Sequence, residues 1–169
     1  MVKKDTPLRE QTVALLNNRG VTIDDISELV YFLQKDYVVG ITTNQCKENV
    51  DAVLSKREVQ NAIITGIQLD IMTEKNELFE PLQSMLDKDE SLYGVDETLA
   101  LSIVNVYGSI GFTNYGYIDK IKPGILTKLN AHKQGEVHTF LDDLVGAIAA
   151  AAASRMAHKD PIDQDDRFR

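Results

Sequence analysis

Apolar residues recur along most of the chain with the spacing of an α-helix. One stripe at positions i, i+3, i+4 and i+7 consists of Ile26, Leu29, Val30 and Leu33. A longer stripe consists of Val59, Ala62, Ile63, Gly66, Ile67 and Ile71. Residues with this spacing lie on one face of a helix and are buried against neighbouring elements. The two stripes predict a helix that begins at Thr22 and one long helix from Lys56 to about Lys75.

Capping and turn signals divide the rest of the chain into further helices. We expect one helix to begin at Thr6-Pro7. Further helices are expected over about 43–54, 77–87, 96–107 and 137–158. The glycine-rich segment 108–116 is predicted to be a loop or a broken segment, and no run alternates for long enough to predict a strand. The sequence therefore predicts an all-α fold, a single-domain bundle of about six to eight helices over residues 1–159. A polar C-terminal tail is expected at 160–169.

Composition places the chain among globular proteins and excludes one class of partner. Of the 169 residues, 43% are apolar and 26% are charged, and the formal net charge is −8. A protein that grips nucleic acid needs a basic face, so we expect no nucleic-acid partner. The segment 70–97 contains nine acidic residues and two lysines and carries −7 of the net charge. Most of it, 74–90, is interpreted as a solvated face.

Cysteine content and hydropathy indicate a cytoplasmic protein. Cys46 is alone, which excludes an internal disulfide and a cysteine-rich zinc site. The N-terminal segment lacks the apolar region of a secretory signal. A charge-free window at 98–118 is long enough to cross a bilayer, but it contains several polar residues and three glycines. We interpret it as a buried helix followed by a loop and expect no transmembrane segment.

Two acidic pairs occur on helices that are otherwise apolar. Asp142 and Asp143 lie within the most apolar predicted helix, and Asp96 and Glu97 begin another. Buried carboxylates are unfavourable unless they are paired or bind a metal, although acids in a first turn also favour the helix dipole. Together the two pairs could form an all-oxygen site for Mg²⁺, which prefers carboxylates and water.

A short segment between these pairs adds a third candidate. Asp119 could contribute a further carboxylate, and Lys122, which precedes Pro123, could bind a phosphate oxygen. A surface turn with exposed lysines is the alternative interpretation of this segment. The pattern D-x-x-K-P is short, so it has to be considered together with the two acidic pairs.

The three segments in this order resemble the phosphatidylglycerophosphatase A family. The matching stretches are 96–101, 118–123 and 140–147, and the similarity in order and spacing extends over about 95–154. The whole chain is similar to the soluble, helical branch of that family from Gram-positive bacteria. The resemblance implies a Mg²⁺-dependent phosphatase of lipid metabolism that converts phosphatidylglycerophosphate to phosphatidylglycerol.

The resemblance also implies roles for particular residues. The expected metal ligands are Asp96, Glu97, Asp119, Asp142 and Asp143. The expected catalytic residues are Asp142, Asp143, Asp119 and Lys122, and the substrate phosphate would be bound by Lys122, with Lys56 and Arg57 as lesser candidates. The attacking group is either a metal-bound water or one of the aspartates, and the sequence does not separate these.

The partners and the competing functions follow from the same residues. Lys120, Lys122, Lys128 and Lys133, with Asp119, form a stretch of net charge +3 that could face anionic lipids at the inner face of the membrane. His138 could carry a proton for the site. Helical bundles as apolar as this one often self-associate, so we expect a homo-oligomer. The alternative functions are an all-α nucleotide pyrophosphohydrolase and a non-enzymatic helical oligomerisation or adaptor protein.

Overall fold

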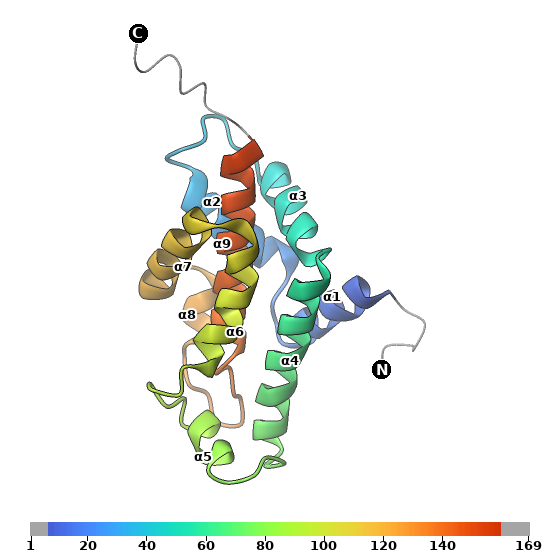
Figure 1. The fold of residues 1–169 in the computed structure, drawn as a ribbon, viewed down its shortest axis with the longest axis vertical. Coiled ribbons are helices and arrows are strands. Elements are labelled where there is room, and N and C mark those ends of the chain that lie inside the picture. Colours follow the sequence, from blue (N-terminus) through green and yellow to red (C-terminus); the bar gives the residue numbers. More distant parts are fainter. Residues whose placement is uncertain (1–6, 160–169) are drawn as a thin grey trace.

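The computed structural model describes residues 7–159, and this part of the chain is all-helical (Figure 1). The helices are α1 (Leu8–Asn18), α2 (Ile23–Gln34), α3 (Thr43–Leu54), α4 (Arg57–Glu74), α5 (Leu82–Asp87), α6 (Val95–Val104), the 3₁₀ helix η1 (Asn105–Tyr107), α7 (Ser109–Ile121), α8 (Ile125–Leu129) and α9 (Leu141–Lys159). These form one compact domain. The predicted all-α class is confirmed.

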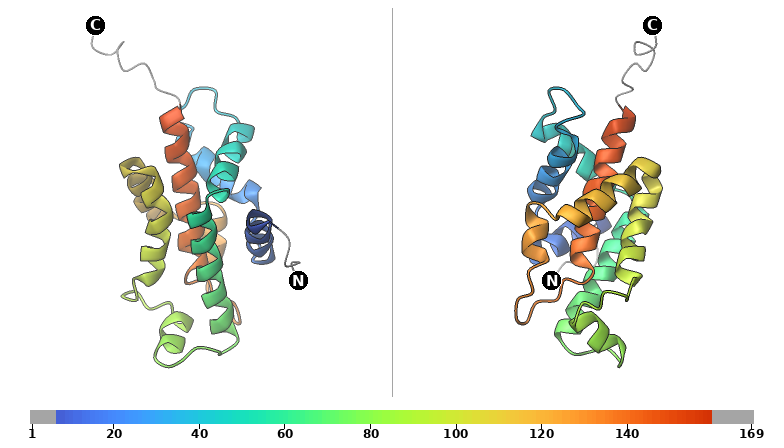
Figure 2. Two further views of the ribbon diagram at one scale, coloured as in Figure 1. Left: turned by 45° about the vertical axis from the view of Figure 1, so that its right-hand side comes forward. Right: turned by 90° about the vertical axis from the view of Figure 1, so that its left-hand side faces the viewer.

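Helix α9 is the central element of the bundle. It runs through the middle of the molecule (Figure 1), and the left view of Figure 2 shows α2 and α3 on one side of it and α6 and α7 on the other. The run Ala149–Ala153 is fully buried. Small side chains allow several helices to approach α9 closely, and their van der Waals contacts form the core. The apolar C-terminal helix that the sequence predicts is therefore the axis of the fold.

Local capping defines the starts of α2 and α3. The Thr22 hydroxyl accepts a hydrogen bond from the Asp25 amide at 3.1 Å, and the Asp25 carboxylate accepts one from the Thr22 amide at 2.8 Å. Thr42 and Gln45 form the same reciprocal arrangement at α3. These capping boxes satisfy amide groups that have no partner inside a helix. The predicted starts at Thr22 and at residue 43 are confirmed.

The predicted loop at 108–116 is wrong, because this segment is most of α7. Gly116 faces open space, and a Cβ at Gly111 would lie 3.0 Å from Val104 Cγ1. Glycine inside a helix is unfavourable by about 1 kcal/mol, but packing of the helix against neighbours outweighs this. At Gly111 the missing side chain is what permits the close approach. Tertiary packing therefore forms a helix where local propensity predicts none.

Other helix boundaries differ from the sequence prediction. The acidic helix expected over 77–87 is confined to α5, which begins after Pro81, and the last helix begins at Leu141 instead of residue 137. The described residues contain nine α-helices, more than the six to eight expected, since α7 and α8 both form in the region around Pro123. The predicted tail at 160–169 lies outside the described residues. Within residues 7–159, no helix has the length and apolarity needed to cross a membrane.

Candidate active site

Three buried carboxylates meet where α9 begins. Asp142 and Asp143 lie in the first turn of α9 and are 8% and 7% exposed. Asp96, in the first turn of α6, is 9% exposed, and its charge raises the pKa of Asp143. Helices α6 and α9 pack against each other, which brings residues 46 positions apart in the chain together. The structure therefore brings one member of the second acidic pair, Asp96, to both members of the first.

A fourth carboxylate and an ammonium reach this cluster from the end of α7. Lys122 Nζ donates hydrogen bonds to Asp119 Oδ1 at 2.9 Å and to Asp142 Oδ2 at 3.1 Å. Lys122 ends α7 in the left-handed conformation, with φ +47°, which is unfavourable for a lysine by about 1 kcal/mol. This backbone conformation accompanies the contact of its ammonium with α9.

The electrostatics of the cluster favour an added cation. Burial raises the pKa of Asp142 and of Asp143, and for Asp143 the neighbouring charges of Asp142 and Asp96 raise it further. Burial likewise raises the pKa of Asp96. Burial alone would lower the pKa of Lys122, but Asp142 and Asp119 overcome this effect and raise it. One ammonium thus shares a site with several desolvated carboxylates.

The donor chemistry of this cluster fits Mg²⁺. The side chains of Asp96, Asp119, Asp142 and Asp143 offer carboxylate oxygens alone, the ligands that this ion prefers. A bound dication would also stabilise the ionised form of the buried acids, whose pKa values are raised without it. Among residues 7–159, no three acidic, histidine or cysteine side chains form a ready-made metal-ligand group. The Lys122 ammonium bonds to two of the candidate ligands, so metal binding would require these side chains to rearrange.

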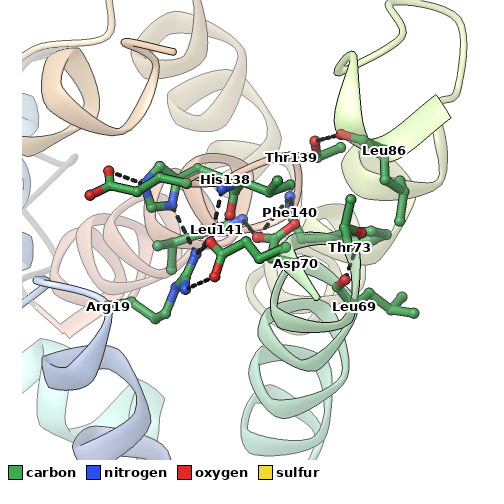
Figure 3. A network of polar contacts seen from close by, with 12 residues as sticks. Arg19, Leu69, Asp70, Thr73, Leu86, His138, Thr139, Phe140 and Leu141 are labelled. Carbon is green, nitrogen blue, oxygen red and sulfur yellow. Dashed lines mark hydrogen bonds and ion pairs between the residues drawn. The ribbon is translucent and has the colours of Figure 1, made fainter. Parts of the chain in front are cut away.

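A second polar network holds the segment that leads into α9 (Figure 3). The Asp70 carboxylate on α4 accepts hydrogen bonds from the Phe140 amide at 3.0 Å and from the Leu141 amide at 3.0 Å. These amides belong to the helix start, so Asp70 satisfies donors that a helix leaves without intrahelical partners. Burial raises the pKa of Asp70 to about 8. Asp70 therefore fixes the start of α9 two residues before the acidic pair.

Arg19 and Glu74 reinforce the same segment. Arg19 forms an ion pair with Glu74 at 2.5 Å and donates to the Val137 carbonyl at 2.8 Å, while the Val137 amide donates to Glu74 at 2.8 Å. These bonds hold Val137 outside the helix, which explains why α9 begins at Leu141. The hydrogen bond to Glu74 raises the pKa of Arg19. The interpretation of 74–90 as a solvated face is thus wrong at Glu74.

Sequence reasoning missed Asp70 and Arg19, although one signal for Asp70 was available. Asp70 follows Ile63 by seven positions and Ile67 by three, so it lies on the apolar stripe of the long helix. A lone acid on such a stripe indicates a buried carboxylate with specific partners. No local pattern indicates Arg19, whose partners are 55 and 118 residues further along the chain.

The other predicted site residues are not hydrogen-bonded to this cluster in the described part of the chain. Glu97 is exposed, whereas its neighbour Asp96 is buried. Lys56 and Arg57 are exposed at the start of α4, about 20 Å along that helix from Asp70, which contacts α9 next to the acidic pair. His138 precedes α9 and lies between Arg19 and Glu136, at 3.4 and 3.3 Å. Lys56 and Arg57 therefore lie away from the carboxylates, whereas His138 borders the same cavity as Asp142 while its ring contacts Arg19 and Glu136.

Comparison with known proteins identifies the family. The family model described as Phosphatidylglycerophosphatase A matches residues 11–158. The chain belongs to the phosphatidylglycerophosphatase A family. The match includes all four carboxylates of the cluster, Lys122 and the Asp70 network. The resemblance noted from the three sequence segments is confirmed.

Relatives of known sequence or structure cover almost the whole chain. Two Bacillus subtilis relatives, YutG and YpjQ, are both described as uncharacterized. YutG is 66% identical to this chain over 86% of this chain and 88% of YutG. YpjQ is 52% identical over 92% of this chain and 87% of YpjQ. The crystal structure of the low temperature requirement C protein from Listeria monocytogenes aligns with a TM-score of 0.89 at 66% identity, covering 92% of this chain and 98% of that one. A Bacillus stearothermophilus protein of unknown function aligns with a TM-score of 0.89 at 62% identity, covering 92% and 97%. The all-helical fold is therefore shared by close relatives within this family.

Proposed function

We propose that this protein is a Mg²⁺-dependent phosphatase that converts phosphatidylglycerophosphate to phosphatidylglycerol. The observation that carries the proposal is the buried carboxylate cluster at the start of α9, with Asp142 bonded to the Lys122 ammonium. A phosphomonoester has a dianionic head that requires both a cation and a hydrogen-bond donor. Membership of the phosphatidylglycerophosphatase A family supports the choice of this lipid as the substrate.

The residues of the cluster would have different roles in hydrolysis. Asp96, Asp119, Asp142 and Asp143 would hold Mg²⁺, which when bound polarises the phosphoryl group and lowers the pKa of a coordinated water. Lys122 would move from Asp119 and Asp142 to a phosphoryl oxygen and neutralise its charge. In hydrolysis the water oxygen forms a bond to phosphorus, the phosphorus–ester oxygen bond breaks, and the lipid alcohol leaves with a proton.

The polar network around Asp70 would hold the two α9 aspartates in position relative to Lys122. The Asp70 carboxylate accepts hydrogen bonds from the Phe140 and Leu141 amides, and Asp142 Oδ1 accepts one from the Asp143 amide at 2.9 Å. The amide donors of the α9 start are therefore directed at protein carboxylates. This arrangement leaves the substrate phosphate to the Lys122 side of the cluster.

We further propose that the protein acts at the membrane surface as a homo-oligomer. The lysines at 120, 128 and 133 are exposed close to Lys122 in the chain, and each basic residue near an anionic surface contributes about 1 kcal/mol of attraction. A lipid phosphate could then reach Lys122 without a membrane-spanning helix. The fully buried run Ala149–Ala153 belongs to the core of one chain, so an oligomer would have to use other surfaces.

A phosphate-release assay tests this function. With MgCl₂, we expect release from phosphatidylglycerophosphate and little from nucleotides or sugar phosphates, and EDTA should abolish it. Asp142→Asn and Asp143→Asn should each lower kcat at least about 100-fold, because each removes a carboxylate from the cluster. Both variants should keep the helical circular dichroism of the wild type.

Glu28→Gln, which removes an exposed carboxylate on α2, is the matched control and should retain full activity. Full activity in both aspartate variants would overturn the site. Release of pyrophosphate from nucleotides would indicate the pyrophosphohydrolase alternative, and no hydrolysis of any of these substrates would indicate the adaptor alternative.

A further inference from the structure

A buried tyrosine on α7 has a hydroxyl group without a partner. Tyr115 is 7% exposed, and its hydroxyl makes no hydrogen bond in the described part of the chain. Its ring packs against α9 at Gly146, where an added Cβ would lie 3.8 Å from Tyr115 Cε2. Buried hydroxyl groups in proteins almost always have a partner, and an unpaired one is unfavourable. The absence of a partner at this position therefore requires an explanation.

The position of this ring relates it to the carboxylate cluster. Tyr115 precedes Asp119 by one helical turn on α7, and Gly146 follows Asp142 by one turn on α9. The two helices pack closely together, so the ring lies one turn from an acid on each of them. The tyrosine thus borders the same site as Lys122, from the side of α7.

The charges around the hydroxyl keep it protonated. Burial raises the pKa of Tyr115, and the carboxylates of Asp143, Asp119, Glu97 and Asp142 raise it further. The hydroxyl therefore remains a hydrogen-bond donor throughout the physiological pH range. Within residues 7–159 this donor has no acceptor and no exposed surface, so an incoming anion would reach it only after the side chains around Lys122 rearrange, as metal binding also requires.

We propose that the Tyr115 hydroxyl binds substrate by donating a hydrogen bond to a non-bridging phosphoryl oxygen. This inference rests on the proposed phosphatase function and adds a contact to it. Lys122 would meet the phosphoryl group from the end of α7, and Tyr115 would meet it from one turn earlier on the same helix. The phenol adds a neutral donor, which strengthens phosphate binding without removing charge from the carboxylates that hold the cation.

The test compares two tyrosines that have the same unusual feature. Among the described residues the Tyr107 hydroxyl is also buried without a partner, but the charges that act on it are those of Arg155 and Glu58. Tyr115→Phe and Tyr107→Phe therefore delete the same atom in two different surroundings. For both variants we would measure the binding of inorganic phosphate in MgCl₂ by calorimetry, Mg²⁺ binding, hydrolysis of phosphatidylglycerophosphate, and Tm.

We expect Tyr115→Phe to weaken phosphate binding and to lower kcat/KM by about 10- to 100-fold, because a hydrogen bond to a charged group is lost. Its Mg²⁺ affinity should stay at the wild-type value. Its Tm should be equal to or above that of the wild type, because an unpaired buried hydroxyl has been removed. Tyr107→Phe should resemble the wild type in phosphate binding and in kinetics.

Two results would overturn this inference alone. In the first, the wild type hydrolyses the substrate, and Tyr115→Phe binds phosphate with the same affinity as the wild type. The other is a Tyr115→Phe variant that loses Mg²⁺ affinity or Tm and keeps its phosphate affinity, which would indicate a role in shaping the carboxylates. A wild-type protein that neither hydrolyses phosphomonoesters nor binds phosphate would overturn the proposed function, and this inference with it.

Discussion

At the scale of single residues, buried charge in this protein is balanced by few partners. Lys122 bonds to Asp119 and Asp142, whereas Asp143 is left beside other carboxylates, which raise its pKa. Asp70 is completely buried and accepts two backbone amides, yet its pKa is raised to about 8. Desolvation is thus the largest effect on the pKa values of Asp70, Asp142 and Asp143, and it makes stability depend on pH.

Asp70 should make the protein less stable as the pH rises. The folded chain keeps the Asp70 proton up to about pH 8, while the unfolded chain releases it near 3.8. Between these values the unfolded state binds fewer protons, so the free energy of unfolding falls by up to about 1.4 kcal/mol per pH unit. Asp70→Asn, which keeps an acceptor for the Phe140 amide, should flatten this part of the profile.

Urea unfolding at pH 5, 6, 7 and 8 would measure the effect. The other buried acids contribute in both proteins, so the informative quantity is the difference between the wild type and Asp70→Asn. This difference should change steadily across the range, and Glu28→Gln should run parallel to the wild type. Parallel profiles for Asp70→Asn and the wild type would contradict a raised pKa of Asp70.

At the scale of elements, α9 combines two requirements that conflict. Its first turn carries two acids, and the rest of the helix is packed on several sides by α2, α3, α4, α6 and α7. Gly66 on α4 shows how tight this packing is, since an added Cβ would lie 2.6 Å from Leu144 Cδ1. Packing this close leaves little room for larger side chains at the buried alanines of α9, while the network around Asp70 holds its polar start.

Enlarging a small side chain in α9 should destabilise the fold. Ala150 is fully buried, so Ala150→Leu would force neighbouring side chains out of their preferred rotamers, and we expect a loss of about 1–3 kcal/mol. Gln68→Leu on the exposed face of α4 is the control and should change stability by less than about 0.5 kcal/mol. Urea unfolding would compare them, and equal stabilities would contradict this packing.

At the scale of the whole molecule, the bundle gathers acids from three helices at one end of α9. Asp96 comes from α6, Asp119 from α7, and Asp142 and Asp143 from α9. Only the folded state contains this cluster, because in the unfolded chain these residues are separated by long segments. A cation that binds the cluster would therefore stabilise the folded state.

Magnesium should raise the melting temperature of the wild type. A concentration 100 times the dissociation constant stabilises by about 2.7 kcal/mol, and each kcal/mol shifts the Tm of a domain of this size by about 2 to 4 °C. Asp143→Asn should lose most of this shift, and NaCl of equal ionic strength should not reproduce it. Differential scanning calorimetry would measure the effect, and an equal Mg²⁺ response in Asp143→Asn would contradict a site at this cluster.

What the sequence determined by itself is mainly local. The stripe at Ile26, Leu29, Val30 and Leu33 and the cap at Thr22 specify α2, because the periods of a helix and its capping groups involve residues a few positions apart. The order of the segments around Asp96, Asp119 and Asp142 was enough to indicate the family. Local patterns thus predicted the all-α class and the acids of the candidate site.

The tertiary structure alone decided which of these residues meet and what surrounds them. It folds 109–121 into a helix, buries Asp96 but exposes Glu97, and joins Asp70 to a backbone 70 residues away. It also places the unpaired Tyr115 hydroxyl beside the acids. Burial and long-range contacts depend on how the helices pack, and no local sequence pattern specifies that packing. Burial and these contacts in turn determine which carboxylates are desolvated and which donors remain available to a substrate.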